Sequence, residues 1–330
     1  MDFSAILTAA VTGAIGPVAA AYALAAIGLN IHFGYTGLLN FGQVGFMLVG
    51  GYGVAISVSE FALPLWVGVL VGVLCAVVLA LLLGIPTLRL RADYLAIATI
   101  AAGEILRLFY RSSFAEPLTG GVYGLQQFAG DFYELNPYPP GSYGIGPISF
   151  SARDLWVATL GWGLVLLGVL LVYLLIHSPW GRVLRSIRED ENAARSLGKN
   201  VYAYKLQSLV LGGVIGALGG MVMVINTQSA SADSFDPVVT FFLYTLLVLG
   251  GAGRVLGPVI GSVLFWFVMV FLDALLRQAI ATGLIPSTVL ADAEVGAVRF
   301  ALVGLGLLLL MVFRPQGILG RREEMVLDAR

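Results

Sequence analysis

Charged residues are scarce in this chain. Only 11% of its 330 residues are Asp, Glu, Lys or Arg, whereas 59% are hydrophobic. A soluble domain usually carries roughly 25% charged residues and under about 50% apolar ones. A chain so poor in charge cannot cover a surface in water, so lipid is the predicted surroundings for most of it. The net charge of −1 also offers no attraction for nucleic acid.

Side chains that bind metals or carry out redox chemistry are equally few. Cys75 is the single cysteine, so no disulfide can form within the chain. The two histidines, His32 and His177, stand far apart and belong to no Cys/His cluster. We therefore predict no metal site. No nucleophile–base pair appears in the apolar runs, which disfavours a membrane enzyme and predicts no catalytic residue.

Two further sequence features are missing, a signal peptide and a phosphate-binding loop. No Lys or Arg precedes Arg89, and a secretory signal peptide needs a basic region before its apolar run. The apolar stretch 5–29 is therefore expected to stay as a transmembrane helix. The motif Gly-x-x-x-x-Gly-Lys-Ser/Thr is also missing, so no phosphate-binding loop is predicted. If ATP drives the protein, another polypeptide hydrolyses it, and this chain binds no cofactor.

Long apolar runs dominate what is present. A helix needs about 20 apolar residues to cross the hydrocarbon. The runs are continuous, whereas a membrane barrel strand alternates over about 10 residues. The sequence therefore predicts an all-α polytopic membrane protein with about nine transmembrane helices, or eight to ten because one run is short. The runs are 5–29, 37–56, 62–85, 93–110, 154–177, 205–226, 237–250, 256–276 and 295–313.

Basic residues predict the orientation, because cytoplasmic loops carry an excess of Lys and Arg. They concentrate in 178–205 and in the tail 314–330. Four predicted crossings separate these two segments, so both can lie in the cytoplasm. The N-terminus and the long loop 111–153 are then expected outside. Residues 1–330 are predicted to form one transmembrane domain.

The basic segment 178–205 has helix signals of its own. Ser178-Pro179 is a favourable helix start, and Gly198 is a natural helix end. Asp190 can act as a second N-cap, which would divide the run into two short helices. Apolar residues recur at helical spacing on one face, namely Val183, Leu184, Ile187, Ala194 and Leu197. Such a segment either contacts another protein in the cytoplasm or lies on lipid as an amphipathic connector.

Glu191, Ala193, Ala194 and Gly198 resemble the Glu-Ala-Ala then Gly signature of ATP-binding-cassette (ABC) importer permeases, with Asn192 in place of the first alanine. The wider sequence resembles the branched-chain amino acid permeases of the LivH/LivM family, most closely the LivM branch. Matching blocks follow one another in the order of that family, and Asn40 and Gln43 stand where Ser and His are expected. The blocks are 34–43, 91–97 with 103–107, 118–121, 250–253 with 257–261, and 313–318.

The resemblance implies a multi-pass permease in the cell inner or plasma membrane. The coupling helix of such a permease docks on an ATPase. The residues implied in this contact are Glu191, Ala193, Ala194, Arg195 and Gly198. The implied partners are two ATPase subunits, which bind ATP and Mg, a paralogous LivH-like permease, and an external or periplasmic substrate-binding protein. The implied cargo is a branched-chain amino acid, and a related permease for urea or short amides is the alternative.

The expected solute path involves the glycine-dense region around Gly37, Asn40, Gly42 and Gln43. Glycine weakens a helix, and amides at membrane depth need hydrogen-bond partners. Broken or re-entrant helices satisfy both conditions and expose backbone groups to a solute. The alternative is close packing of helices through small residues.

Glu104 is the remaining candidate for the path. It lies three residues from Arg107 on one helical face, so the two are expected to pair. An ionisable group inside a membrane segment is a functional candidate. A secondary transporter that uses Glu104 as its ion site is therefore a further alternative, although such a transporter has no need of a docking helix.

Overall fold

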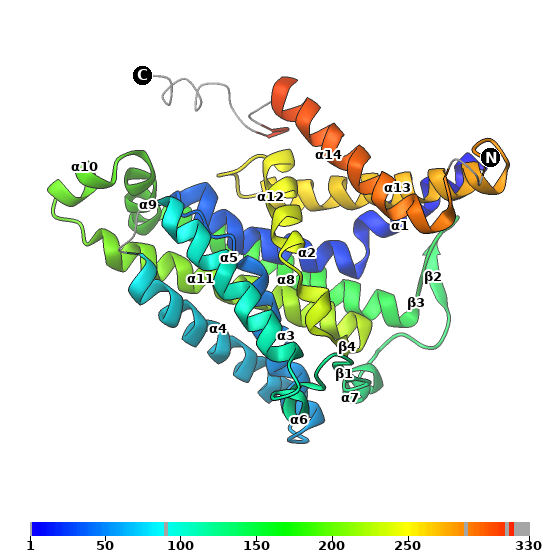
Figure 1. The fold of residues 1–330 in the computed structure, drawn as a ribbon, viewed down its shortest axis with the longest axis horizontal. Helices are drawn as coiled ribbons and strands as arrows, with labels where there is room; N and C mark the ends of the chain where they lie inside the picture. The colour runs from blue at the N-terminus through cyan, green and yellow to red at the C-terminus, as the bar shows by residue number, and fades with distance from the viewer. Residues whose placement is uncertain (1, 89–91, 287–289, 314–316, 320–330) are drawn as a thin grey trace.

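The structure is a computed structural model that describes residues 2–88, 92–286, 290–313 and 317–319, and its regular structure is mainly helical (Figure 1). Helices occupy every predicted apolar run, so the predicted all-α class is confirmed. The α-helices are α1 (Phe3–Ile15), α2 (Pro17–Leu29), α3 (Gln43–Ser59), α4 (Leu65–Thr87), α5 (Ala92–Arg111), α6 (Glu116–Thr119), α7 (Gly130–Glu134), α8 (Ala152–His177), α9 (Pro179–Glu189), α10 (Glu191–Ser196), α11 (Val201–Thr227), α12 (Val238–Gly250), α13 (Gly257–Ala281) and α14 (Val295–Phe313).

Shorter elements join these helices. A π-helix (Asn30–Tyr35) extends α2, and 3₁₀ turns cover Ala232–Phe235 and Asp292–Glu294. Strand β1 (Leu125–Gln126) pairs antiparallel with β4 (Ser229–Ala230). Strand β2 (Ser142–Ile145) pairs antiparallel with β3 (Ile148–Ser151).

The first predicted span is two helices rather than one. Gly16 has extended backbone angles, with φ −71° and ψ 174°, and Pro17 opens α2. Proline disfavours the helical conformation in the residue before it but is well suited to the first helical turn. The prediction of one helix over 5–29 was therefore wrong, and the second helix continues to Tyr35.

Five helical stretches are long and apolar enough to cross a membrane within the described residues. They are Pro17–Tyr35, Leu65–Thr87, Ala152–His177, Val201–Thr227 and Gly257–Ala281. Helices α1, α3 and α12 are apolar but shorter. The structure thus agrees with a polytopic membrane protein, while the number of crossings stays a prediction.

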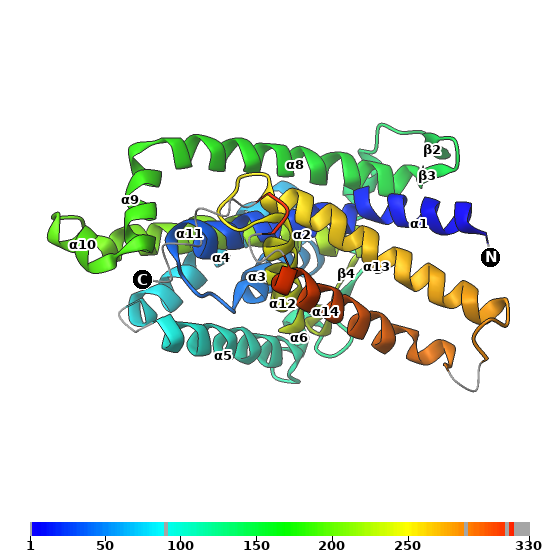
Figure 2. The same ribbon diagram turned by 90° about the horizontal axis from the view of Figure 1, so that it is seen from above.

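The stretch Pro17–Tyr35 and helix α11 form the centre of the bundle. Buried residues make up 89% and 72% of their apolar windows, against 33% in α4, 28% in α8 and 22% in α13. Small side chains allow this close packing: a Cβ on Gly28 would lie 2.2 Å from the carbonyl oxygen of Gly212. Figure 2 shows α8 along one side of the bundle and α5 along the opposite side.

The loop 111–153 and the N-terminal helix lie at one end of the bundle, and α9 and α10 lie at the other (Figures 1 and 2). The loop is tied down by the β1–β4 pair and by the Tyr133 hydroxyl, which donates to the carbonyl of Ile225 at 2.8 Å. Burial raises the pKa of Tyr133, so this hydroxyl stays protonated and remains a donor.

This arrangement matches the predicted relative topology, with the N-terminus and loop 111–153 at one end and 178–205 at the other. Which end faces the cytoplasm stays a prediction. Arg89, Arg91 and the predicted cytoplasmic tail 314–330, except residues 317–319, lie outside the described residues.

Candidate functional site

The predicted coupling segment consists of two short helices, α9 and α10. Pro179 lies in the first turn of α9, directly after Ser178. Asp190 has extended angles, and its Oδ1 accepts the backbone N–H groups of Asn192 at 2.8 Å and Ala193 at 3.0 Å. Gly198 follows α10 with φ +78°, a conformation that glycine adopts without strain. The predicted division at Asp190 and the stop at Gly198 are confirmed.

The two alanines of α10 point in different directions. Ala194 is only 2% exposed and packs in a small cluster with Ile187 and Val201. It therefore faces its own chain, and a docking contact there would require α10 to move. Ala193, Arg195 and Gly198 are exposed. The docking role of all these residues stays a prediction.

Leu197 was expected on the apolar face of the segment, and the structure places it differently. It follows the last residue of α10 and is 78% exposed. Helical spacing no longer holds beyond the helix end, so its side chain points to solvent. Sequence reasoning missed this exposed leucine, and only the early end of α10 at Ser196 distinguishes it.

Glu191 joins the second short helix to the bundle. Its Oε1 lies 2.9 Å from Nη2 of Arg195, and its Oε2 pairs with Nζ of Lys205 in the first turns of α11. The Lys205 side chain is only 14% exposed, so the ion pair is partly shielded from water. Glu191 therefore helps to set the position of α10 relative to α11.

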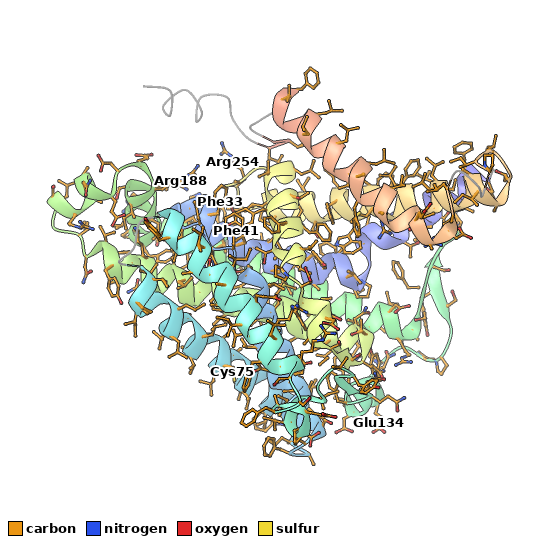
Figure 3. All side chains as sticks on the ribbon, in the orientation of Figure 1. Phe33, Phe41, Cys75, Glu134, Arg188 and Arg254 are labelled. Carbon is orange, nitrogen blue, oxygen red and sulfur yellow. The ribbon has the colours of Figure 1, made fainter. Side chains whose placement is uncertain are left out.

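Arg188, near the end of α9, reaches into the bundle. Its Nη1 donates to the carbonyl of Gly34 in the π-helix at 2.6 Å. A Cβ on Gly253 would lie 3.1 Å from the same nitrogen, and one on Gly37 would lie 3.3 Å from Cγ of Arg188. Gly37 is thus next to the coupling segment. Figure 3 labels Arg188 at this end of the bundle. Sequence reasoning did not single out this residue, because its only signal was its place in a basic run.

Asn30 binds the π-helix to the glycine-rich loop after α12. Its side-chain amide donates to the carbonyl of Arg254 at 2.8 Å, and its Oδ1 accepts the N–H of Gly253 at 2.8 Å. A single amide therefore matches both a donor and an acceptor of that loop. The π-helix, the loop and α9 meet at this end of the bundle.

Asn40 and Gln43 are fully buried in a polar cluster with His32. The Asn40 Nδ2 lies 3.0 Å from His32 Nδ1 and donates to Gln43 Oε1 at 3.1 Å. His32 Nδ1 must accept, so the ring proton is on Nε2, which lies 3.2 Å from the carbonyl oxygen of Leu209. Gln43 Nε2 donates to the carbonyl of Gly212 at 3.2 Å. Both amides are thus occupied by this chain, and their contact with solute stays a prediction.

Gly42 lies where α3 meets α5. The chain between Tyr35 and α3 is irregular, so α3 begins at Gln43 and not at residue 37 as predicted. A Cβ on Gly42 would lie 2.4 Å from the carbonyl oxygen of Thr99 in α5. The structure gives this glycine a packing role, and its place in the path stays a prediction.

Glu104 and Arg107 form the predicted pair. Arg107 Nη2 lies 2.7 Å from Glu104 Oε1, and Nε donates to Oε2 at 2.8 Å, which is a bidentate arrangement. Arg107 Nη1 also pairs with Asp233, ahead of α12, at 2.9 Å. Glu104 therefore belongs to an ion network that joins α5 to the segment before α12.

Comparison with known proteins assigns a family to this fold. The family model "Branched-chain amino acid transport system / permease component" matches residues 12–312. The chain is 27% identical to the high-affinity branched-chain amino acid transport system permease protein LivM of Escherichia coli K12, covering 90% of this chain and 67% of that one. It is 27% identical to a probable LivM of Methanocaldococcus jannaschii, covering 90% of each chain.

A relative with a different name aligns over a shorter region. The nucleoside ABC transporter permease protein NupC of Lactococcus lactis is 27% identical over 243 residues, covering 69% of this chain and 71% of that one. Permeases named for different cargoes thus share this sequence pattern.

Proposed function

Because this chain belongs to the permease family of branched-chain amino acid transport systems, whose members are non-enzymatic membrane subunits of ABC transporters, we propose that it imports branched-chain amino acids. It forms the translocation path together with a paralogous LivH-like permease. Two separate ATPase subunits bind ATP and Mg and supply the energy, and an external or periplasmic binding protein delivers the solute. The N-terminus lies outside and the C-terminus in the cytoplasm.

The coupling segment is the observation that carries this proposal. Helices α9 and α10 project from one end of the bundle (Figure 1). Asp190 and Gly198 define the ends of the second helix, which presents exposed Ala193 and Arg195. A transporter driven by an ion gradient has no use for such a projection, whereas an ATPase needs a contact through which its closure acts on the membrane subunit.

The proposed cargo rests on the share of this chain that aligns with each named relative. The LivM relatives align over 90% of this chain, whereas the nucleoside permease aligns over 69%. Branched-chain amino acids are therefore the cargo class that we propose, with urea, short amides and nucleosides as competitors in the test.

Uptake by the reconstituted transporter tests the proposed function. The chain, purified from its native membranes with the proteins bound to it, is expected to take up labelled leucine only when ATP is supplied. Excess valine should compete, whereas adenosine and urea should not. Uptake driven by an ion gradient without ATP would contradict the proposal, and competition by adenosine or urea alone would reassign the cargo.

Replacing Arg188 by methionine is expected to separate ATP hydrolysis from uptake. The guanidinium joins α9 to the carbonyl of Gly34, and a hydrogen bond to a charged group contributes about 1.5–3 kcal/mol. Its loss should reduce uptake about tenfold or more while the ATPase still binds and hydrolyses ATP. Both rates are measured on the same reconstituted complex, and Arg188→Lys should retain part of the uptake.

Arg182→Met is the matched control. Arg182 is exposed on the same helix, and its side chain has no hydrogen bond or ion pair with the described residues. It should change uptake little. Equal losses of uptake in both variants would contradict a specific role for the bond from Arg188 to Gly34. Loss of stimulated hydrolysis together with uptake in Arg188→Met would show that Arg188 serves docking and does not transmit motion.

A further inference from the structure

Four aromatic rings from three segments form one cluster. Phe33 comes from the π-helix, Phe41 from the irregular segment before α3, and Phe241 and Tyr244 from α12. The centroids of Phe41 and Tyr244 lie 4.7 Å apart in a stacked arrangement. Phe33 meets Tyr244 edge-on at 5.4 Å, and Phe41 lies 5.6 Å from Phe241. Figure 3 labels Phe33, Phe41 and Arg188 in the same part of the bundle. We call these four residues the aromatic cluster.

Hydrogen bonds fix the cluster between α5 and α12. The Tyr244 hydroxyl donates to the carbonyl of Asn40 at 3.1 Å. The backbone N–H of Phe41 donates to the Thr99 hydroxyl in α5 at 3.0 Å. Helices α5 and α12 both lie on the face turned to the viewer in Figure 1. The cluster therefore belongs to that face of the bundle.

This face has features that lipid does not tolerate. Non-helical backbone at membrane depth occurs only where it is buried in protein or lines a water-filled cavity. The irregular segment 36–42 reaches this face with Gly37 exposed and Phe41 half-buried, and Phe241 in α12 is 48% exposed. Most of this segment is buried in the chain itself. Because irregular backbone does not face lipid, we take the surface beside Phe41 and Phe241 to border water or another protein.

Charged groups lie on either side of the aromatic cluster along the bundle. The Glu104–Arg107–Asp233 network lies towards the end that carries loop 111–153. Arg188 lies at the end that carries the coupling segment. The aromatic cluster therefore lies in an apolar zone between two charged ends of the bundle.

We infer that the aromatic cluster is the apolar constriction of the solute path, and that it takes solutes with an apolar side chain. This inference rests on the proposed function. Aromatic faces offer apolar contact without a hydrogen bond, so a branched aliphatic side chain can pass while it is held only weakly. The rings are part-exposed, touch one another and come from separate segments, so a shift of α12 relative to the π-helix would separate them.

The constriction is connected to the coupling segment by two routes, one through the π-helix and one through α12. Phe33 is the neighbour of Gly34, whose carbonyl binds Arg188. Helix α12 leads into Gly253, which lies against the same guanidinium and binds Asn30 of the π-helix. A movement of α9 therefore reaches two of the three segments that carry the rings, the π-helix and α12.

Thiol labelling at position 241 tests whether water reaches the constriction. The chain has one cysteine, so Cys75→Ala provides a background without thiols in this subunit. In that background, Phe241→Cys is expected to react with a membrane-impermeant, charged methanethiosulfonate reagent in the reconstituted complex. The matched control is Leu82→Cys in α4, where the side chain is 67% exposed on a surface without irregular backbone. The labelled mass of this chain is the measurement.

The outcomes separate the constriction from the proposed function. If the unsubstituted complex takes up no leucine with ATP, the proposed function fails. If it transports leucine but positions 241 and 82 are equally unreactive, the constriction is wrong. Faster labelling at 241 that diminishes when leucine saturates the transporter supports it.

A second substitution tests the narrowness of the constriction. Phe241→Trp enlarges a half-exposed ring and should slow uptake about tenfold, because the larger ring leaves less room for a passing solute. The assembled complex should remain at its normal level. Leu82→Trp should change neither quantity. Unchanged uptake in Phe241→Trp would overturn the inference.

Discussion

Replacing Gly42 by leucine will deplete the assembled transporter and reduce uptake in the same proportion. The first atom of any side chain at this position would lie 2.4 Å from the carbonyl oxygen of Thr99. That oxygen belongs to the backbone of α5 and cannot turn away, so α3 and α5 must separate. Overpacking of this kind costs about 1–3 kcal/mol or more. Complex abundance and uptake, measured on the same membranes, check the prediction.

The control for this substitution is Gly163→Leu in α8. Nothing lies within 4 Å of a Cβ at Gly163, so a leucine there should leave abundance and uptake unchanged. Normal abundance of Gly42→Leu with lost uptake would favour a role for Gly42 in the solute path. Wild-type values for both quantities would exclude both roles. Asn40→Ala and Gln43→Ala should act in the same way as Gly42→Leu, because each removes hydrogen bonds within the buried polar cluster.

Leu197→Asp is expected to abolish docking of the ATPase. Leu197 is 78% exposed at the end of the coupling segment, next to exposed Arg195 and Gly198. An exposed leucine gains stability when a partner buries it, whereas a buried unpaired carboxylate costs several kcal/mol. The permease should still reach the membrane, but the ATPase should no longer co-purify with it. Solute-stimulated ATP hydrolysis should be lost as well.

Leu135→Asp is the matched control for this charge. Leu135 is 75% exposed in loop 111–153 at the other end of the bundle, so the same substitution there should leave stimulated hydrolysis unchanged. Normal stimulation in Leu197→Asp would exclude a docking contact at this residue. A substitution at Ala194, such as Ala194→Trp, would not test docking in this way. Ala194 is 2% exposed, so a larger side chain there would displace α10 itself.

Local signals in the sequence were sufficient to predict those helix ends that depend only on neighbouring residues. The start of α9 at Pro179, the break at Asp190 and the stop at Gly198 depend on a proline, a capping carboxylate and a positive φ. Each is a property of one or two residues. The pairing of Glu104 with Arg107 was predictable for the same reason, since three residues along a helix bring two side chains together.

Contacts between distant residues were not predictable in this way. Leu197 and Ala194 fit one helical pattern, yet one is exposed and the other buried, because α10 ends between them and packs Ala194 against Val201. The bond from Arg188 to Gly34 joins residues 154 positions apart. A contact between residues so far apart leaves no periodic pattern in the sequence. The run of arginines therefore did not show which arginine reaches the bundle.

Composition and apolar runs alone determined that this protein is helical and lies in a membrane, because backbone groups in hydrocarbon must be satisfied within the segment. The tertiary structure decided what the glycine-dense region does. It closes Asn40 and Gln43 into a buried cluster with His32 and brings Phe33, Phe41 and Tyr244 together at the face beside α5. Packing of three separate segments made that arrangement, and it depends on distances that no single stretch of sequence contains.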